Sequence, residues 1–206
     1  MKRMLKDAAV LFVITLIAGA LLGAVYQITK DPIARQEALA LERACREVFA
    51  EADSFVNEED FDAAAAELFL KENGYEGQSV NGYQTAMTAD GQTAGYVLTV
   101  TTHEGYGGDI QFTMGIRMDG TLNGISLLSI AETPGLGMQA QEVLVPQFSQ
   151  KNAYPFVVTK TGAVSKDQID AISGATVTSD ALTGGVNAGM FYFRTNLSEG
   201  GVPDAE

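Results

Sequence analysis

The chain has 206 residues, a net charge of −13 at pH 7, one cysteine and one histidine. This length accommodates one membrane segment and one domain with a sizeable core. A single cysteine excludes an intramolecular disulfide and a cysteine-ligated cluster, and a lone histidine cannot build a histidine metal site, so nothing in the composition indicates a zinc or haem protein and no metal ligands are expected.

The N-terminus is predicted to form a retained membrane anchor. Residues 1–7 are basic, and no charged residue occurs from Ala8 to Ile28, which matches the ~20 residues that a helix needs to cross a bilayer. A cleaved signal peptide has the same order of basic and apolar segments, but its apolar core is usually only about 7–15 residues long. We therefore expect a transmembrane helix over residues 8–29.

The charges that flank this helix predict its orientation. Lys2, Arg3 and Lys6 precede it, whereas Lys30 is followed at once by Asp31, so the positive-inside rule places residues 1–7 in the cytoplasm. The helix is then expected to span the cell membrane, which is the inner membrane where there are two, and the rest of the chain is expected on its extracytoplasmic side. From Asp31 onward, 9 Lys and Arg stand against 25 Asp and Glu, a net charge of −16. Nucleic acid and anionic lipid surfaces repel such a domain.

Residues 30–75 are predicted to form a helical connector. Pro32 can begin one helix, in which apolar positions recur at helical spacing. Cys45 falls within that pattern and is expected to be a buried or half-buried thiol. A second, shorter helix is expected over residues 61–71, because Asn73-Gly74 is typical of a helix end.

Residues 76–198 are predicted to form an α+β domain. The segments with strand character are 94–102, 110–118, 121–130 and 154–159. Asp119-Gly120 between two of them is a strong hairpin signal, and His103 is expected at a solvent-facing strand end. The glycine pattern of a dinucleotide site is missing. We therefore expect an antiparallel or mixed sheet packed by helices, followed by a flexible tail over residues 199–206.

A rigid loop is predicted directly after the apolar run 125–130. Its sequence is Glu132-Thr133-Pro134-Gly135-Leu136-Gly137-Met138. Proline fixes φ, and the glycines permit backbone geometries that other residues avoid. Such a loop can present main-chain groups, and the Leu136 side chain, to a flat ring. Taken alone, the segment is also compatible with a simple turn after a strand.

The segment Asp170-Ala171-Ile172-Ser173-Gly174-Ala175-Thr176-Val177-Thr178-Ser179 precedes a helix expected over residues 179–196. Its threonines therefore lie at or just before a helix N-terminus, where unpaired backbone N–H groups and the helix dipole favour an anion. Gly174 allows close approach of the backbone. The alternative interpretation is that Thr176, Thr178 or Ser179 only caps the helix.

In their order, these features resemble the G subunit of the Rnf membrane electron-transport complexes, a member of the FMN-binding domain family. They resemble the C subunit of the sodium-translocating NADH:quinone reductase more distantly. The resemblance runs nearly end to end and rests on the membrane helix, Gly105-Tyr106-Gly107-Gly108 before a strand, the Glu132–Gly137 loop and the Asp170–Thr176 motif. It implies that a separate flavin transferase attaches FMN covalently to Thr176 as a phosphoester. Thr178 is the competing hydroxyl.

The resemblance also implies a set of cofactor-binding residues around that attachment site. They are Glu132, Thr133, Gly135, Leu136, Gly137, Asp170, Ser173, Gly174, Ala175 and Thr178. Of these, Asp170 and Ser173 are expected to orient the threonine loop, the acid through hydrogen bonds to backbone N–H groups. No catalytic residues are expected, because the sequence contains no nucleophile elbow, no His–Asp pair around a serine and no cysteine–histidine pair.

The function implied by the resemblance is electron relay within a ferredoxin:NAD⁺ oxidoreductase complex that translocates Na⁺ or H⁺, without an independent substrate site. The implied partners are the other Rnf-type membrane subunits with their redox centres, the flavin transferase during maturation, and membrane lipid, but not nucleic acid. Two alternatives stay open: a free-standing membrane-anchored flavoprotein that passes electrons to extracellular acceptors, and a flavin-free anchored binding or assembly module.

Overall fold

The computed structural model describes residues 2–198, apart from the side chains of Lys2 and Leu5, so the predicted tail lies outside the described residues. The chain divides into two compact units, Met1–Ala40 and Leu41–Glu206. The second unit thus begins within the segment predicted as a connector. Residues that follow Ala40 pack with the sheet domain instead of merely leading to it.

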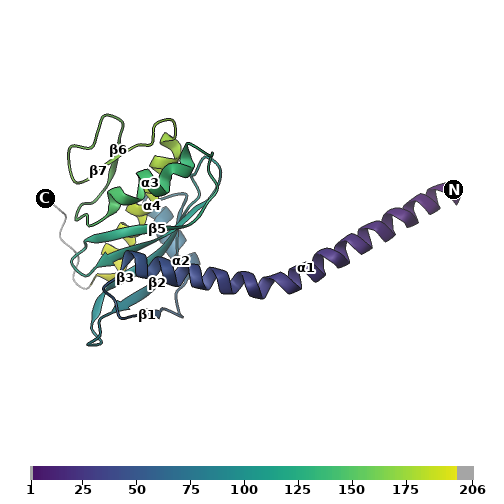
Figure 1. Cartoon of the computed structure of the whole chain (residues 1–206), viewed down its shortest axis with the longest axis horizontal. Coiled ribbons are helices and arrows are strands. Elements are labelled where there is room, and N and C mark those ends of the chain that lie inside the picture. The colour runs from purple at the N-terminus through teal and green to yellow at the C-terminus, as the bar shows by residue number, and fades with distance from the viewer. Residues whose placement is uncertain (1, 199–206) are drawn as a thin grey trace. The chain divides into compact units, whose positions relative to one another are not determined.

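The first helix, α1, extends from Lys2 to Val48 without interruption (Figure 1). Among the described residues, it is the one helix long and apolar enough to cross a membrane, and its apolar segment is entirely exposed. Pro32 lies inside α1, so the prediction that it begins a helix was wrong. A proline inside a helix loses one backbone hydrogen bond and crowds the carbonyl four residues earlier, at a cost of about 3 kcal/mol, but its fixed φ is compatible with a helix. Helix-favouring segments on both sides therefore continue the helix through it.

The second unit contains a five-stranded sheet in which all neighbouring strands are antiparallel. In spatial order the strands are β1 (Ser54–Asn57), β2 (Gln78–Met87), β3 (Thr93–Thr102), β4 (Ile110–Arg117) and β5 (Leu122–Ile130). The predicted strands 94–102, 110–118 and 121–130 are confirmed. So is the hairpin between the last two, whose turn is fixed by a hydrogen bond from the Thr121 N–H to Asp119 Oδ1 at 2.9 Å.

Two strands of this five-stranded sheet escaped prediction, and each has a physical reason. The edge strand β1 exposes three of its four residues and leaves the fourth half-buried, so it shows no buried face. It also lies in the segment predicted as a helical connector, which is therefore not helical throughout. In β2, the register shifts between Val80 and Gly82, and this irregularity interrupts the alternation that marks a strand.

The short helix α2 spans Ala63–Glu72, close to the predicted 61–71. Asp62 caps its start, because its Oδ1 accepts a hydrogen bond from the Ala65 N–H at 3.0 Å. At its end, the Asn73 N–H donates to the Leu70 carbonyl at 3.1 Å. Asn73-Gly74 therefore ends the helix as the sequence indicated.

The remaining elements follow β5. They are η1 (Gly137–Gln139), α3 (Ala140–Val143), η2 (Val145–Phe148), the parallel pair β6 (Val157–Thr159) and β7 (Gln168–Asp170), α4 (Thr176–Tyr192) and η3 (Phe193–Leu197). Only the last three residues of the predicted strand 154–159 are strand. The predicted C-terminal helix is confirmed, but it begins three residues earlier than expected, at Thr176, and its α-helical part ends at Tyr192.

Both faces of the large sheet are covered within the second unit (Figure 1). Helix α4 packs on one face, where Leu182, Val186 and Met190 join the main core. A smaller cluster on the other face contains Cys45, Val48, Phe49, Ala52, Ala86 and Val97. Cys45 is fully buried, as predicted, and its Sγ donates to Gln84 Oε1 at 3.2 Å. Burial raises the pKa of this thiol to about 11, so it stays protonated at neutral pH.

Candidate functional site

A cleft of about 490 Å³ lies between the loop that follows β5 and the N-terminus of α4. This volume falls in the range of ~300–1,000 Å³ that is usual for small-molecule sites. The residues that line it are Tyr106, Glu132, Thr133, Leu136, Gly137, Gly174, Ala175, Thr176, Val177 and Thr178. The two segments singled out in the sequence therefore meet at one site.

The loop after β5 is folded by its own backbone. The Thr133 carbonyl accepts hydrogen bonds from the Leu136 N–H at 3.1 Å and from the Met138 N–H at 3.3 Å. Gly135 has a φ of +75°, a conformation that other residues rarely adopt. This turn places Leu136, which is 40% exposed, at the cleft. The predicted tight loop is thus present, and Gly135 shapes it without lining the cleft itself.

Close contacts join this loop to the helix N-terminus. A Cβ atom on Gly137 would lie 2.6 Å from Thr178 Oγ1 and 2.7 Å from Glu132 Cβ, so only glycine fits there. Gly174 has a φ of +78°, and a Cβ atom on it would lie 3.1 Å from Leu136 Cδ2. Glycine is therefore required at both positions for the loop and the helix to meet.

A third segment, Gly105-Tyr106-Gly107-Gly108, completes the wall. Glu132 is only 7% exposed, and its Oε1 accepts a hydrogen bond from the Gly107 N–H at 3.3 Å. Tyr106 is 74% exposed and lines the cleft. Tyr106 was not among the predicted cofactor-binding residues, although the glycines around it were the available signal of an aromatic ring held on a tight loop.

The two candidate hydroxyl groups differ in access. Thr176 is the first residue of α4, is partly exposed and lines the cleft. Thr178 is only 1% exposed. Both residues line the cleft, but only Thr176 keeps solvent-exposed surface there, whereas Thr178 is buried with its hydroxyl against Gly137.

The alternative interpretation, that one of these side chains only caps the helix, is wrong. The N-cap residue of α4 is Ala175, and no side chain caps this terminus. The Ser179 hydroxyl instead accepts a hydrogen bond from the Ile172 N–H at 3.0 Å and donates to the Ala175 carbonyl at 2.9 Å. Since the first N–H groups of a helix have no partner inside it, those at the start of α4 are available to an anion.

Asp170 and Ser173 are not brought into the cleft. The main-chain N–H and carbonyl of Asp170 pair with the Gln147 side chain at 2.7 and 3.1 Å. Its Oδ1 is buried without a hydrogen-bond partner among the described residues, so the expected bonds from this carboxylate to the threonine loop are not found. Ser173 is exposed and does not line the cleft.

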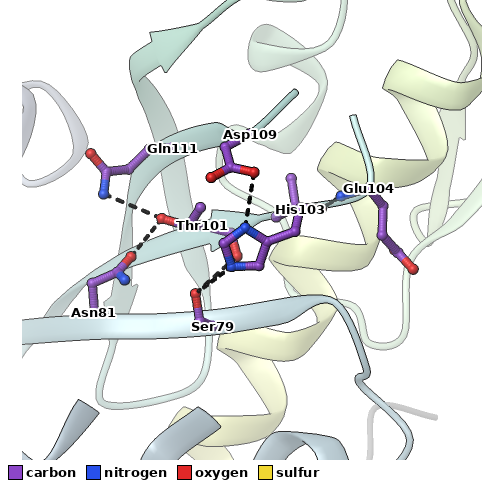
Figure 2. A network of polar contacts seen from close by, with 8 residues as sticks. Ser79, Asn81, Thr101, His103, Glu104, Asp109 and Gln111 are labelled. Carbon is purple, nitrogen blue, oxygen red and sulfur yellow. Dashed lines mark hydrogen bonds and ion pairs between the residues drawn. The ribbon is translucent and has the colours of Figure 1, made fainter. Parts of the chain in front are cut away.

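A second polar cluster joins the ends of β2, β3 and β4 (Figure 2). His103 Nε2 lies 3.3 Å from Ser79 Oγ, and His103 Nδ1 lies 2.9 Å from Asp109 Oδ1. The expectation of no His–Asp pair around a serine was therefore wrong, because the antiparallel register brings together residues that are separated in sequence. Ser79 is only 5% exposed and its hydroxyl also reaches the Thr101 carbonyl, so it is not presented as a nucleophile.

The rest of that cluster is a structural cross-link. The Thr101 hydroxyl donates to Asn81 Oδ1 at 2.6 Å and accepts from Gln111 Nε2 at 3.2 Å (Figure 2). These side chains belong to three adjacent strands. None of them lines the cleft at α4. They join β3 to β4 at the end of the sheet where the Gly105–Gly108 loop connects these two strands, and His103 lies just past the end of β3, half exposed, as predicted.

Chemically, the cleft combines an apolar surface with an anion-binding corner. Tyr106 and Leu136 offer apolar surface to a planar ring, and the free N–H groups of α4 lie beside the accessible Thr176 hydroxyl. The one carboxylate in its lining, that of Glu132, is held by the Gly107 backbone. These residues fit a ligand with a flat ring and a phosphate group.

Comparisons with known proteins identify a family of relatives for this chain. Residues 1–48 match the family model "RnfG N-terminal region", and residues 105–190 match the "FMN-binding domain". The G subunit of the Na(+)-translocating ferredoxin:NAD(+) oxidoreductase complex of Acetobacterium woodii is 31% identical over 96% of this chain and 95% of its own length. The G subunit of the proton-translocating complex of Clostridium ljungdahlii is 33% identical over 88% and 90%. The crystal structure of Shewanella oneidensis NqrC is similar at 19% identity, with a TM-score of 0.45 over 72% of this chain and 81% of that chain.

Proposed function

The chain belongs to the family of G subunits of the ion-translocating Rnf oxidoreductase complexes and contains its FMN-binding domain, and from this we propose that it relays electrons through an FMN esterified to Thr176. The observation that carries the proposal is the position of Thr176. It is the accessible hydroxyl of the cleft, it begins α4, and its competitor Thr178 is enclosed.

The attachment reaction balances with FAD as the donor. The Thr176 oxygen forms a bond to the phosphorus of the FMN half, the pyrophosphate bond of FAD breaks, AMP leaves, and the hydroxyl proton is lost. The resulting phosphate diester keeps one negative charge. No basic side chain lines the cleft among residues 2–198, so the N–H groups and dipole of the α4 N-terminus are the groups that stabilise this charge. Gly174 leaves room for the phosphate beside the backbone.

Once bound, FMN supplies one- and two-electron transfer. The residues of the chain hold and tune it. Tyr106 and Leu136 would offer apolar surface to the ring, Glu132 would place the carboxylate of the cleft lining near it, and the glycine loops hold the two walls close together. The cleft is open enough for a ring edge to stay accessible, which suits an electron donor and acceptor that are proteins and require no separate substrate pocket.

The proposed setting is a membrane complex. The apolar part of α1 anchors the chain in the cell membrane, the basic N-terminus stays in the cytoplasm, and the flavin domain lies outside. The other subunits of the complex and their redox centres are the proposed partners, with a flavin transferase during maturation. Protease added to intact cells should digest the domain. Digestion that occurs only in inverted vesicles would overturn this orientation.

Mass spectrometry of peptides tests the attachment directly. After coexpression with a flavin transferase, the fragment that spans Asp170 to Ser179 should carry the mass of FMN, and fragmentation should locate it on Thr176. An unmodified fragment would favour a flavin-free module, and a label on Thr178 would refute the assigned residue. Copurification with several polytopic membrane proteins would distinguish a member of a complex from a free-standing carrier.

A further inference from the structure

A groove of about 440 Å³ lies beside the start of α2 and the end of α4. It is separated from the flavin cleft by the length of α4, roughly 24 Å from Thr176 to Tyr192 at the usual rise of a helix. None of its lining residues is shared with the flavin cleft. It is therefore a distinct surface, and the inference drawn from it does not depend on whether Thr176 carries FMN.

The floor of the groove is aromatic. Phe61 stands nearly perpendicular to Tyr83, with ring centroids 5.7 Å apart, and at 71° to Tyr192, at 6.1 Å. Phe69 also lines the groove and meets Tyr192 edge-on at 6.2 Å. These four rings are only half-buried. They present ring surface to solvent in a fixed arrangement, which is the composition of a protein interface centre.

The rim of the groove is acidic. Glu58, Asp60 and Asp62 line it, and no Lys, Arg or His does so in the described part of the chain. Asp62 is engaged as the cap of α2. Glu58 and Asp60 form no ion pair with any described residue. Burial raises the pKa of Tyr83, and the adjacent Glu58 charge raises it further, so the Tyr83 hydroxyl stays protonated beside that carboxylate.

We propose that this groove is a docking site for an arginine side chain presented by another protein. A guanidinium group is planar, stacks on aromatic rings and donates several hydrogen bonds to carboxylates in a fixed geometry. Rings on the floor, and the rim carboxylates of Glu58 and Asp60, which have no ion pair among the described residues, meet both requirements. The net charge of −16 from Asp31 onward favours a basic partner surface and disfavours an anionic lipid surface.

The chemistry of the groove can be tested on the full chain in detergent, with tyrosine rings labelled for NMR. The probe is N-acetyl-arginine amide, and N-acetyl-citrulline amide is its neutral control of the same shape. The arginine probe should shift the Tyr83 and Tyr192 resonances saturably, and citrulline should not. A Glu58→Gln/Asp60→Asn variant should bind the arginine probe about tenfold more weakly, which corresponds to ~1.4 kcal/mol. Equal shifts from both probes, or unchanged affinity in the variant, would refute the proposal.

The protein partner can be tested in the native membrane. A photo-crosslinking residue at Asn196, which is exposed and lines the groove, should yield a crosslinked peptide from another protein that contains an arginine. Glu58→Lys should abolish this product. Glu59→Lys is the matched control, because Glu59 is the neighbouring exposed acid and does not line the groove; it should leave the product intact. A crosslink to lipid or to a second copy of the chain, or one that survives Glu58→Lys, would overturn the assignment.

Discussion

The two ends of α4 have opposite characters. At its N-terminus, small residues and tight glycine loops leave an open cleft with an accessible hydroxyl group at Thr176. At its C-terminus, aromatic rings form the floor of a groove, pack edge-to-face around Phe61 and continue through Tyr96 to the buried Phe193. One helix therefore connects a site where backbone approaches closely to a site where large side chains dominate the packing.

One end of α4 therefore determines the shape of the cleft, and the other end contributes to the folding stability of the domain. At the N-terminal end, the contacts that matter are between backbone and short side chains, and they determine what fits in the cleft. At the C-terminal end, burial of large rings contributes free energy, since a buried aromatic side chain removes far more apolar surface from water than Thr or Gly. Substitutions at the first end should change flavin attachment more than folding. Substitutions at the second end should do the reverse.

The largest expected effect is complete loss of covalent flavin in Thr176→Ala. The variant removes the accessible hydroxyl, but its free energy of unfolding should change by only about 0.5 kcal/mol, because the side chain is partly exposed and does not cap α4. Flavin fluorescence of denatured protein in a gel measures the attachment. Thr178→Ala is the control and should retain the fluorescence, and a signal that disappears only in this control would reverse the assignment.

The opposite end should respond through stability. Phe193 is fully buried, so Phe193→Ala should lower the free energy of unfolding by about 3–5 kcal/mol. Covalent flavin per folded protein should stay unchanged. Val177→Ala is the matched change at the N-terminal end, where the side chain is 49% exposed, and should cost below about 0.5 kcal/mol. Denaturant unfolding followed by circular dichroism measures both, and similar costs for the two variants would contradict the proposed separation.

The two ends also differ in how well the sequence predicted them. The cleft at the start of α4 is built from short motifs in which glycine and proline define the backbone locally, so the loop 132–137 and the threonine segment could be recognised from the sequence. The sequence did not show which further residues lie at the cleft. Tyr106 lines it from a third segment, whereas Asp170 lies outside it, with its main chain hydrogen-bonded to Gln147.

The aromatic groove had no such local signal. Its floor combines Phe61 and Phe69 from around α2, Tyr83 from β2 and Tyr192 from α4. Strand β2 was not predicted, because its register shift disrupts the alternating pattern. The Ser79–His103–Asp109 cluster was also missed. Ser79 lies on β2, and only the pairing of β2 with β3 brings it close to His103 and Asp109. A local sequence pattern does not show which residues of two different strands become neighbours when the strands pair.

Two glycine substitutions test whether close contact or backbone strain controls the shape of the cleft. Gly137→Ala should cost about 1–3 kcal/mol and reduce flavin attachment, because its Cβ would overlap Thr178 and Glu132. Gly135→Ala places its Cβ in open space and meets only the strain of a φ of +75°, so about 1 kcal/mol is expected, with attachment largely retained. Thermal unfolding and the flavin content per chain measure both. A larger loss in Gly135→Ala than in Gly137→Ala would mean that turn strain, not the contact with α4, controls the cleft.

The smallest expected effect is a change in flavin potential in Leu136→Glu. Leu136 is 40% exposed at the cleft and lies against Gly174, so a carboxylate there adds a negative charge near the ring without leaving a cavity in the core. A partly solvated charge beside the ring should disfavour the reduced, more negative flavin by about 1 kcal/mol. This lowers the reduction potential of a two-electron couple by on the order of 20 mV. Redox titration of the purified protein measures the shift. Leu136→Gln is the neutral control of similar size. If both variants shift the potential equally, loss of the apolar contact is the cause, and if neither does, Leu136 does not contact the flavin.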